Sequence, residues 1–139
     1  MKGLDALIRL HSWELDAKRR ELADIEREED ALHGRVAQLE AHVAHEQAFA
    51  RESESGMYVF QGFMAGVKEM RKQLDQQIAE VRQRIEAKRE EVAEAYQELK
   101  RYEITQAEIL KKEKIEADRR AQGELDEISL NQHRRREGA

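Results

Sequence analysis

Residues 67–85 read VKEMRKQLDQQIAEVRQRI, and in this stretch apolar side chains recur every three or four residues between charged and amide side chains. This spacing lines the apolar side chains along one face of an α-helix, as in a coiled coil. One additional step of four residues, from Leu74 to Ile78, interrupts the strict heptad and predicts a local relaxation of the supercoil. The stretch therefore predicts a long helix with one apolar seam that packs against a second helix.

The seam continues beyond this stretch and has a counterpart in the first part of the chain. The earlier seam consists of Leu4, Ile8, His11, Leu15, Lys18, Leu22, Ile25, Glu29, Leu32, Val36, Leu39, Val43, Glu46 and Ala50. The later seam consists of Val67, Met70, Leu74, Ile78, Val81, Ile85, Lys88, Val92, Ala95, Leu99, Tyr102, Gln106 and Ile109. Both are mostly apolar at coiled-coil spacing, which predicts two long helices.

Between the two seams lies the stretch SESGMYVFQG, residues 53–62, where Ser and Gly cluster and an apolar run replaces the charge pattern. Such a cluster is typical of a turn. We therefore predict a single coiled-coil domain over residues 1–139, with a first helix over about residues 3–53, a turn over 54–62 and a second helix over about 63–134.

A common register supports an antiparallel hairpin. If paired residue numbers sum to about 117, apolar residues meet in successive layers. These layers include Ile8 with Ile109, Leu32 with Ile85, Val36 with Val81 and Val43 with Leu74. The same register places Glu29 opposite Lys88 and His11 opposite Gln106, so polar interruptions of the seam meet each other. The predicted fold is all-α, a long antiparallel two-helix coiled-coil hairpin, although an antiparallel dimer swapped through the turn would share this register.

This register leaves the chain after about Ile115 without a partner helix, so a C-terminal helical tail should overhang the hairpin. Its seam is weak, and Gly123 within it costs a helix about 1 kcal/mol. We therefore expect a marginal helix, ending in a basic stretch from His133 to Arg136 that suits a helix C-terminus.

Composition excludes several classes of protein. The chain has 139 residues, of which 40% are charged and 5% aromatic, and it contains neither proline nor cysteine. A disulfide scaffold and a thiolate zinc site are thereby excluded. The net charge of -5 gives no general attraction to nucleic acid or anionic lipid. No stretch approaches the roughly 20 apolar residues of a membrane span. We expect a cytoplasmic protein without nucleic-acid binding or membrane insertion.

The sequence offers no support for catalysis or a cofactor, because it lacks a glycine-rich phosphate loop, a nucleophile elbow and a Cys/His pair. His42, His45 and Glu46 share one helical turn and could approach a metal ion, but further ligands are not evident nearby. A solvated helix face is the better interpretation. The basic ending could contact phosphate, yet it has no interleaved aromatic residues, so helix capping or a protein contact is favoured.

Apolar residues off the seam are candidates for partner binding, because a helix pair buries only one stripe of each helix. Near the termini these residues are Leu7, Leu10, Trp13, Ile104, Leu110, Ile115, Leu125, Ile128 and Leu130. Around the expected turn they are Met57, Tyr58, Val59, Phe60 and Phe63. The first set could instead be ordinary surface or a third helical layer, and the second could plug the end of the hairpin. The clustering of these apolar residues near the termini and near the turn also fits two surfaces that bind partner proteins.

Two motifs resemble the FliJ family of flagellar export proteins. The opening reads LDALIRL at residues 4–10, followed by KRREL at 18–22. The tail reads RRAQGELDEI at residues 119–128, followed by three arginines at 134–136. The resemblance covers nearly the whole chain and implies a nonenzymatic cytoplasmic stalk, peripheral at the basal body. Such a stalk joins the export ATPase to the membrane export gate and helps to recycle export chaperones.

The resemblance also implies binding residues. The terminal end would enter the ATPase ring, with contacts drawn from Leu10, Trp13, Leu125 and Ile128. The segment after the turn would meet the gate protein, with contacts drawn from Met70 and Leu74. Met70 and Leu74 match a spacing used in the family for gate binding, but both also belong to the predicted seam.

Two other functions fit a hairpin of this kind. One is a coiled-coil factor that probes the secondary channel of RNA polymerase with acidic residues at its tip. Glu52 and Glu54 flank the expected turn, but its apex reads GMYVF, without an adjacent acid pair, and there is no second globular domain. The other is a structural scaffold or dimerisation rod, which would form a stable dimer where a stalk would be monomeric or weakly associating.

Overall fold

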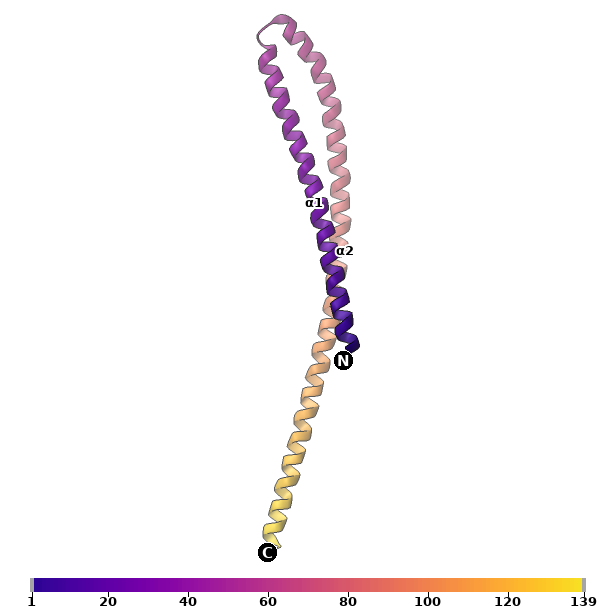
Figure 1. Ribbon diagram of the computed structural model, residues 1–139, viewed down its shortest axis with the longest axis vertical. Coiled ribbons are helices and arrows are strands. Elements are labelled where there is room, and N and C mark those ends of the chain that lie inside the picture. The colour runs from indigo at the N-terminus through magenta and orange to yellow at the C-terminus, as the bar shows by residue number, and fades with distance from the viewer. Residues whose placement is uncertain (1, 139) are drawn as a thin grey trace. The chain divides into compact units, whose positions relative to one another are not determined.

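A computed structural model describes residues 2–138 of the chain and the side chains of residues 3–138. It contains two helices, α1 (Lys2–Ala50) and α2 (Glu54–Glu137), and no strand occurs in this range. The helices pack against each other as an antiparallel hairpin (Figure 1), which confirms the predicted all-α fold. No 18-residue window of either helix, within the described residues, is apolar enough to cross a membrane.

The chain divides into two compact units, which we describe separately. Residues Trp13–Tyr96 form the hairpin unit, which contains the turn. Residues 2–12 and 97–138 are the described part of the terminal unit. The expectation of a single domain stays a prediction.

The core of the hairpin unit follows the predicted seam. Ile25, Val81 and Ile85 form one buried cluster, against which Leu22 and Leu32 pack. Val36, Leu74 and Ile78 form a second cluster, which contacts Leu32 and Leu39. The buried apolar residues of both units are Leu15, Ile25, Val36, Ala50, Val67, Leu74, Ile78, Val81, Ile85 and Leu99. Each belongs to the seam read from the sequence.

The turn lies earlier than predicted. Helix α1 ends at Ala50, not near Ser53, and α2 begins at Glu54, so residues 51–53 make the connection and the predicted turn at 54–62 is wrong. The Ser53 hydroxyl caps α2 by accepting a hydrogen bond from the Gly56 backbone N–H at 3.0 Å. A Cβ on Gly56 would lie 2.9 Å from the Ala50 carbonyl oxygen. Ser53 thus caps the start of α2, and the missing side chain of Gly56 allows α2 to lie close to the end of α1.

Loss of this cap should destabilise the hairpin measurably. We expect Ser53→Ala to lower the free energy of unfolding by about 1 kcal/mol, because the Gly56 N–H loses its acceptor. Chemical denaturation followed by circular dichroism would measure the change. Ser55→Ala is the matched control, since the Ser55 hydroxyl has only a contact of 3.5 Å with the Ser53 hydroxyl. Equal losses in the two variants would contradict the capping role.

The register of the helix pair also differs from the prediction. Glu29 pairs with Arg82 at 3.3 Å, and Lys88 pairs with Glu21 at 2.8 Å, whereas Glu29 and Lys88 were expected to face each other. Val36 clusters with Leu74 and Ile78 and not, as expected, with Val81. Partners in α2 therefore lie about one to two helical turns earlier than predicted. The reason is the turn, which is centred before Glu54 and not at Tyr58.

Ion pairs between α1 and α2 flank the core of the hairpin unit. Beyond the two pairs above, Arg84 bonds Glu28 at 2.6 Å and Arg71 bonds Glu40 at 2.7 Å. Exposed pairs of this kind add little to stability, but they help to fix the alignment of the helices.

These pairs account for the shifted pKa values in the hairpin unit. The Arg82 hydrogen bond lowers the pKa of Glu29, with a smaller contribution from His33. Bonds to Glu21 and then Glu91 raise the pKa of Lys88, and the Lys88 contact lowers the pKa of Glu91. Bonds to Glu40 and then Asp75 raise the pKa of Arg71. Each charged form is thus stabilised by its partner.

In the terminal unit, the first residues of α1 pair with α2 just after Gln97. His11 stacks on Tyr102 with ring centroids 4.7 Å apart, and Gln106 donates a hydrogen bond to Asp5. His11 therefore faces Tyr102 and not the expected Gln106. From Leu110 to residue 138 every residue is exposed, while α2 continues through Gly123 to Glu137. The structure thus has the predicted overhanging tail, and its stability in isolation stays a prediction.

Candidate partner-binding sites

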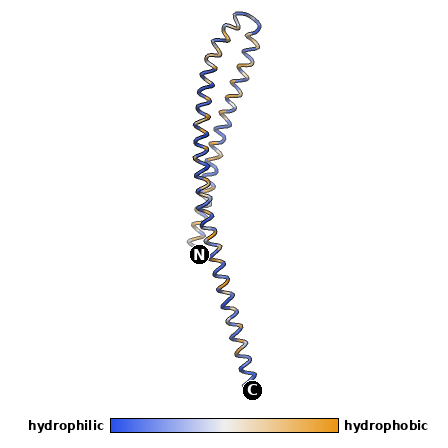
Figure 2. Tube along the Cα trace, turned by 180° about the vertical axis from the view of Figure 1, so that it is seen from behind, coloured by the Kyte–Doolittle hydropathy of each residue, from blue (hydrophilic) through white to orange (hydrophobic). Residues whose placement is uncertain are grey.

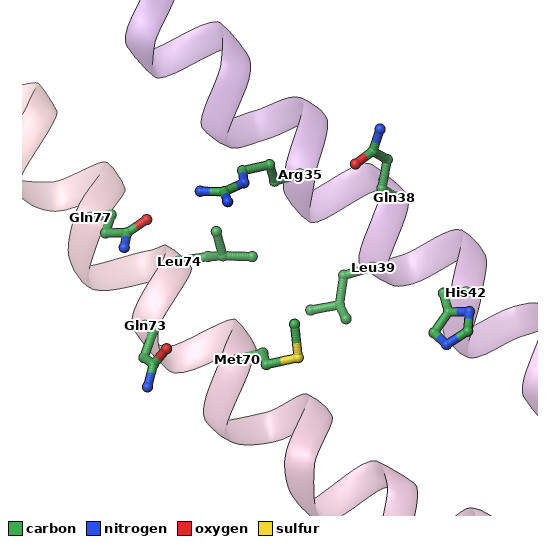
Figure 3. A pocket seen from close by; sticks show the side chains of 8 residues that line it. All are labelled: Arg35, Gln38, Leu39, His42, Met70, Gln73, Leu74 and Gln77. Atoms are coloured by element: carbon green, nitrogen blue, oxygen red, sulfur yellow. The ribbon is translucent and has the colours of Figure 1, made fainter.

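The hairpin unit contains a groove between α1 and α2 that we call the Met70 groove (Figure 3). Its volume is about 370 Å³. Helix α1 contributes Arg35, Gln38, Leu39 and His42, and α2 contributes Met70, Gln73, Leu74 and Gln77. The floor combines Leu39, Leu74 and the Met70 thioether, and the remaining lining side chains are polar. The groove can therefore accept an apolar side chain with hydrogen-bonding groups around it.

The structure separates the two residues proposed together for gate binding. Met70 is 54% exposed although it belongs to the seam, whereas Leu74 is 9% exposed and packs with Val36 and Ile78. Met70 can contact a partner directly. Leu74 belongs to the core, so its substitution would disturb the helix pair as well as any contact in the groove.

The charge of the Met70 groove is distinctive. Arg35 lines it and no carboxylate does. Four other grooves along the described residues each include at least one carboxylate, from Glu46, Asp75, Glu28 with Glu80, and Glu113 with Glu116. Among the described residues, no carboxylate lies within ion-pairing distance of Arg35. Arg35 also lines the adjacent groove that contains Glu28 and Glu80, so it lies between a groove without carboxylates and one with two of them.

Aromatic residues gather near the turn, at the tip of the hairpin unit. Tyr58 is 81% exposed, and Phe49 and Val59 are also largely exposed. Phe60 and Phe63 are half-buried, with ring centroids 6.0 Å apart. These last two line a second groove of about 360 Å³, together with Phe49 and Val59.

Phe49 was not among the residues singled out from the sequence. Its position off the seam, next to Ala50, nevertheless indicated an exposed side chain. Because the true apex is residues 51–53, Glu52 lies in the turn itself. The predicted apex at GMYVF was therefore wrong, although residues 51–53 also contain no adjacent pair of acidic residues.

The terminal unit carries a separate set of exposed apolar residues. Leu7 and Leu10 lie on α1, and the others lie along α2. Those on α2 are Ile104, Leu110, Ile115, Leu125, Ile128 and Leu130. Figure 2 shows the tail as mostly hydrophilic, interrupted by separate hydrophobic positions. Trp13, which belongs to the hairpin unit, is 64% exposed.

A metal site at His42, His45 and Glu46 receives no support. In the described part of the chain, no group of three or more His, Cys, Asp or Glu residues could hold a metal ion. His42 instead packs edge-on against Phe63, with ring centroids 5.2 Å apart.

Comparison with known proteins supports the family resemblance. The sequence model of one family, described as flagellar FliJ protein, matches residues 1–138. This chain belongs to the FliJ family. The flagellar FliJ proteins of two Caulobacter vibrioides strains, NA1000 / CB15N and ATCC 19089 / CIP 103742 / CB 15, are each 31% identical to it over 131 residues, which cover 93% of this chain and 93% of the relative. No solved structure matches the chain.

FliJ membership makes the chain a component of flagellum biogenesis and protein export. The FliJ family is not a known family of enzymes. Membership in the FliJ family also argues against the RNA polymerase alternative.

Proposed function

We propose that this FliJ protein is a nonenzymatic coupling component that links the flagellar export ATPase to the export gate and escorts or recycles export chaperones. The observation that carries the proposal is the presence of exposed apolar residues in both units, on a chain whose helix pair buries only its seam. Exposed apolar residues concentrated in this way mark protein contacts more often than solvated surface. Two separate sets suit a protein that binds two partners.

The terminal unit is the proposed ATPase contact. Leu125 and Ile128 are three residues apart on the exposed tail, so they share one face of α2, and Leu125 is 59% exposed. Leu7 and Leu10 add exposed apolar side chains on α1. A helix with such residues and no partner of its own can insert its apolar face into a groove of another protein.

The hairpin unit is the proposed gate contact. Tyr58 and Met70 are exposed on α2, with Phe60 and Phe63 half-buried between them. Aromatic and Met side chains provide much contact area and are enriched at protein interfaces. We place the protein in the cytoplasm, peripheral at the export gate of the basal body.

A nonenzymatic role agrees with the electrostatics of the hairpin unit. The shifted pKa values of Glu29, Arg71, Lys88 and Glu91 have hydrogen-bonded ion pairs as their largest causes. Catalytic groups are instead usually perturbed by desolvation within a cleft. These charged residues therefore suit alignment of the helices.

The proposal predicts that the two contacts can be removed separately. We expect Leu125→Ser/Ile128→Ser to weaken ATPase binding at least about tenfold with gate binding unchanged, because exposed anchors dominate such interfaces. Tyr58→Ser/Met70→Ser should have the opposite selectivity. Pull-down and titration with the export ATPase and the gate cytoplasmic domain from the same organism would measure both affinities.

The control is Gln132→Ser, which changes an exposed polar side chain of the same tail and should leave both affinities unchanged. Absence of binding to either partner would overturn the proposal. A stable dimer in solution, measured by light scattering, would favour the scaffold alternative.

A further inference from the structure

The groove at the tip of the hairpin unit, which we call the tip groove, combines an aromatic lining with free carboxylates. All three phenylalanines of the chain line it, namely Phe49, Phe60 and Phe63. Glu46 is the one charged residue of the lining, and Glu52 and Glu54 lie exposed in the turn and at the start of α2. Within residues 3–138 none of these carboxylates forms an ion pair. The tip groove can therefore accept an apolar side chain that has a cation beside it.

The end of the tail carries the complementary groups. Leu130 is 56% exposed and points away from the face of Leu125 and Ile128, because a helix turns by about 100° per residue. The proposed ATPase contact therefore does not use Leu130. Arg134 follows Leu130 by four residues, so the two side chains are neighbours on one face. Arginines in the last turn suit a helix C-terminus, but that role does not account for the exposed leucine beside them.

We propose that the tip groove of one copy of this protein receives the tail end of a second copy, with Leu130 between the phenylalanines and Arg134 at Glu46. The charges of the two segments favour this occupant. Residues 46–55 contain three carboxylates and one arginine, whereas residues 133–137 contain three arginines and one carboxylate. A guanidinium also stacks favourably on aromatic rings. Phe60 and Leu130 belong to the same continuous helix, so the tail in the groove comes from another copy.

The proposed contact is head-to-tail, so each pair of chains keeps one free tip and one free tail and can add further copies. One leucine and one or two ion pairs form a small interface, so we expect weak association, with a Kd on the order of 100 µM at low salt. Such association differs from the stable dimer expected of a scaffold. It does not rest on the proposed function, because a chain that is monomeric at low concentration can still bind both partners.

The first test is sedimentation of the full chain at concentrations from about 10 to about 500 µM, over which the average mass should rise. Phe49→Ser removes an aromatic ring of the tip groove and Leu130→Ser removes the anchor of the tail. We expect each to weaken association at least about tenfold. The matched control is Ile115→Ser, which removes an exposed apolar side chain of α2 outside both segments and should change association less than about twofold. Circular dichroism of each variant checks that helicity is unchanged.

An equimolar mixture of the two variants tests the orientation of the contact. Phe49→Ser keeps its tail and Leu130→Ser keeps its tip groove, so the mixture should form a complex that stops at two chains, with about the affinity of the unsubstituted contact. In a tip-to-tip contact Leu130→Ser would still associate with itself, and in a tail-to-tail contact Phe49→Ser would do so. Either of these results would overturn the proposal.

Charge reversal tests the ion pair between the copies. Glu46→Arg and Arg134→Glu should each weaken association about tenfold, and the double variant Glu46→Arg/Arg134→Glu should recover it to within about threefold of the unsubstituted chain. Failure of the double variant to recover would overturn the pairing of Glu46 with Arg134. An unsubstituted chain that stays monomeric up to about 500 µM in about 50 mM sodium chloride would overturn the whole inference, since screening is weak there. The proposed function would be untouched, because binding of the ATPase and the gate domain tests it separately.

Discussion

Replacing Ile85 by Ala is expected to lower the free energy of unfolding of the hairpin by about 2–3 kcal/mol. Ile85 is 4% exposed and clusters with Ile25 and Val81. The substitution removes three buried carbon atoms and leaves a cavity that its neighbours fill only in part. We expect the lower end of the usual range, because a two-helix core borders solvent and can relax more easily than the interior of a globule. No other residue type in the hairpin should be as costly to truncate as these central aliphatic side chains.

Urea denaturation monitored by circular dichroism would measure this loss as a lower midpoint. The control is Gln83→Ala, an exposed position two residues earlier on α2 that should leave stability within about 0.5 kcal/mol of the original. Because the exposed tail also contributes helix signal, the same comparison should be repeated by near-ultraviolet absorption, which comes from Trp13 and the three tyrosines and not from the tail after Leu110. If both substitutions had the same small effect, the packing of the Ile25, Val81 and Ile85 cluster would not be what holds the hairpin closed.

The core was predictable because it depends on periodicity alone. A stripe of apolar side chains at steps of three and four residues must be removed from water, whichever helix covers it. This requirement identifies residues such as Val36 and Ile85 without knowledge of their partners. It also identifies Met70, which the structure leaves 54% exposed, so membership of the seam did not guarantee burial. Burial additionally depends on how closely the opposite helix approaches at that level.

The register was not predictable in the same way. Apolar residues repeat along both seams, so sliding one helix by about two turns replaces one aliphatic pair by another at little cost. Polar interruptions should remove this degeneracy, but long side chains reach across a helical turn, and Lys88 can therefore meet Glu21 as well as it could meet Glu29. The turn decides the register, and its Ser and Gly residues fit a helix N-cap as well as a loop.

The candidate sites also differ in whether the helical pattern alone predicts them or the register of the two helices is needed. Exposure of Tyr58, Leu125 and Ile128 followed from their positions off the seam, which a helical reading provides. The chemistry of the Met70 groove did not follow, because Arg35 and Met70 are brought together only by the true register. The unpaired state of Arg35 likewise depends on which side chains of α2 face it. A groove between helices therefore becomes visible only when the alignment of the two helices is known.

Paired cysteines should distinguish the observed register from the predicted one almost completely. The natural chain has no cysteine, so introduced thiols have no competitors. We expect Val36→Cys/Leu74→Cys to form a disulfide rapidly under mild oxidation, because Val36 and Leu74 pack in one buried cluster. We expect Val43→Cys/Leu74→Cys to stay largely reduced. Val43 lies seven residues beyond Val36, which is about 10 Å along α1, and a disulfide needs Cα atoms within about 7 Å.

Nonreducing electrophoresis with intact-mass measurement would follow both reactions. The observed register would be contradicted if Val43→Cys/Leu74→Cys crosslinked rapidly and Val36→Cys/Leu74→Cys did not, because this result fits the register predicted from the sequence. The mass of the crosslinked product also shows whether the two helices belong to one chain or to two. Crosslinking within one chain, independent of protein concentration, supports a hairpin closed through residues 51–53. Crosslinking between two chains, increasing with concentration, supports a dimer swapped through the turn, which has the same helix pairs. The same two variants therefore test both the alignment of the helices and the identity of the chain that supplies the second one.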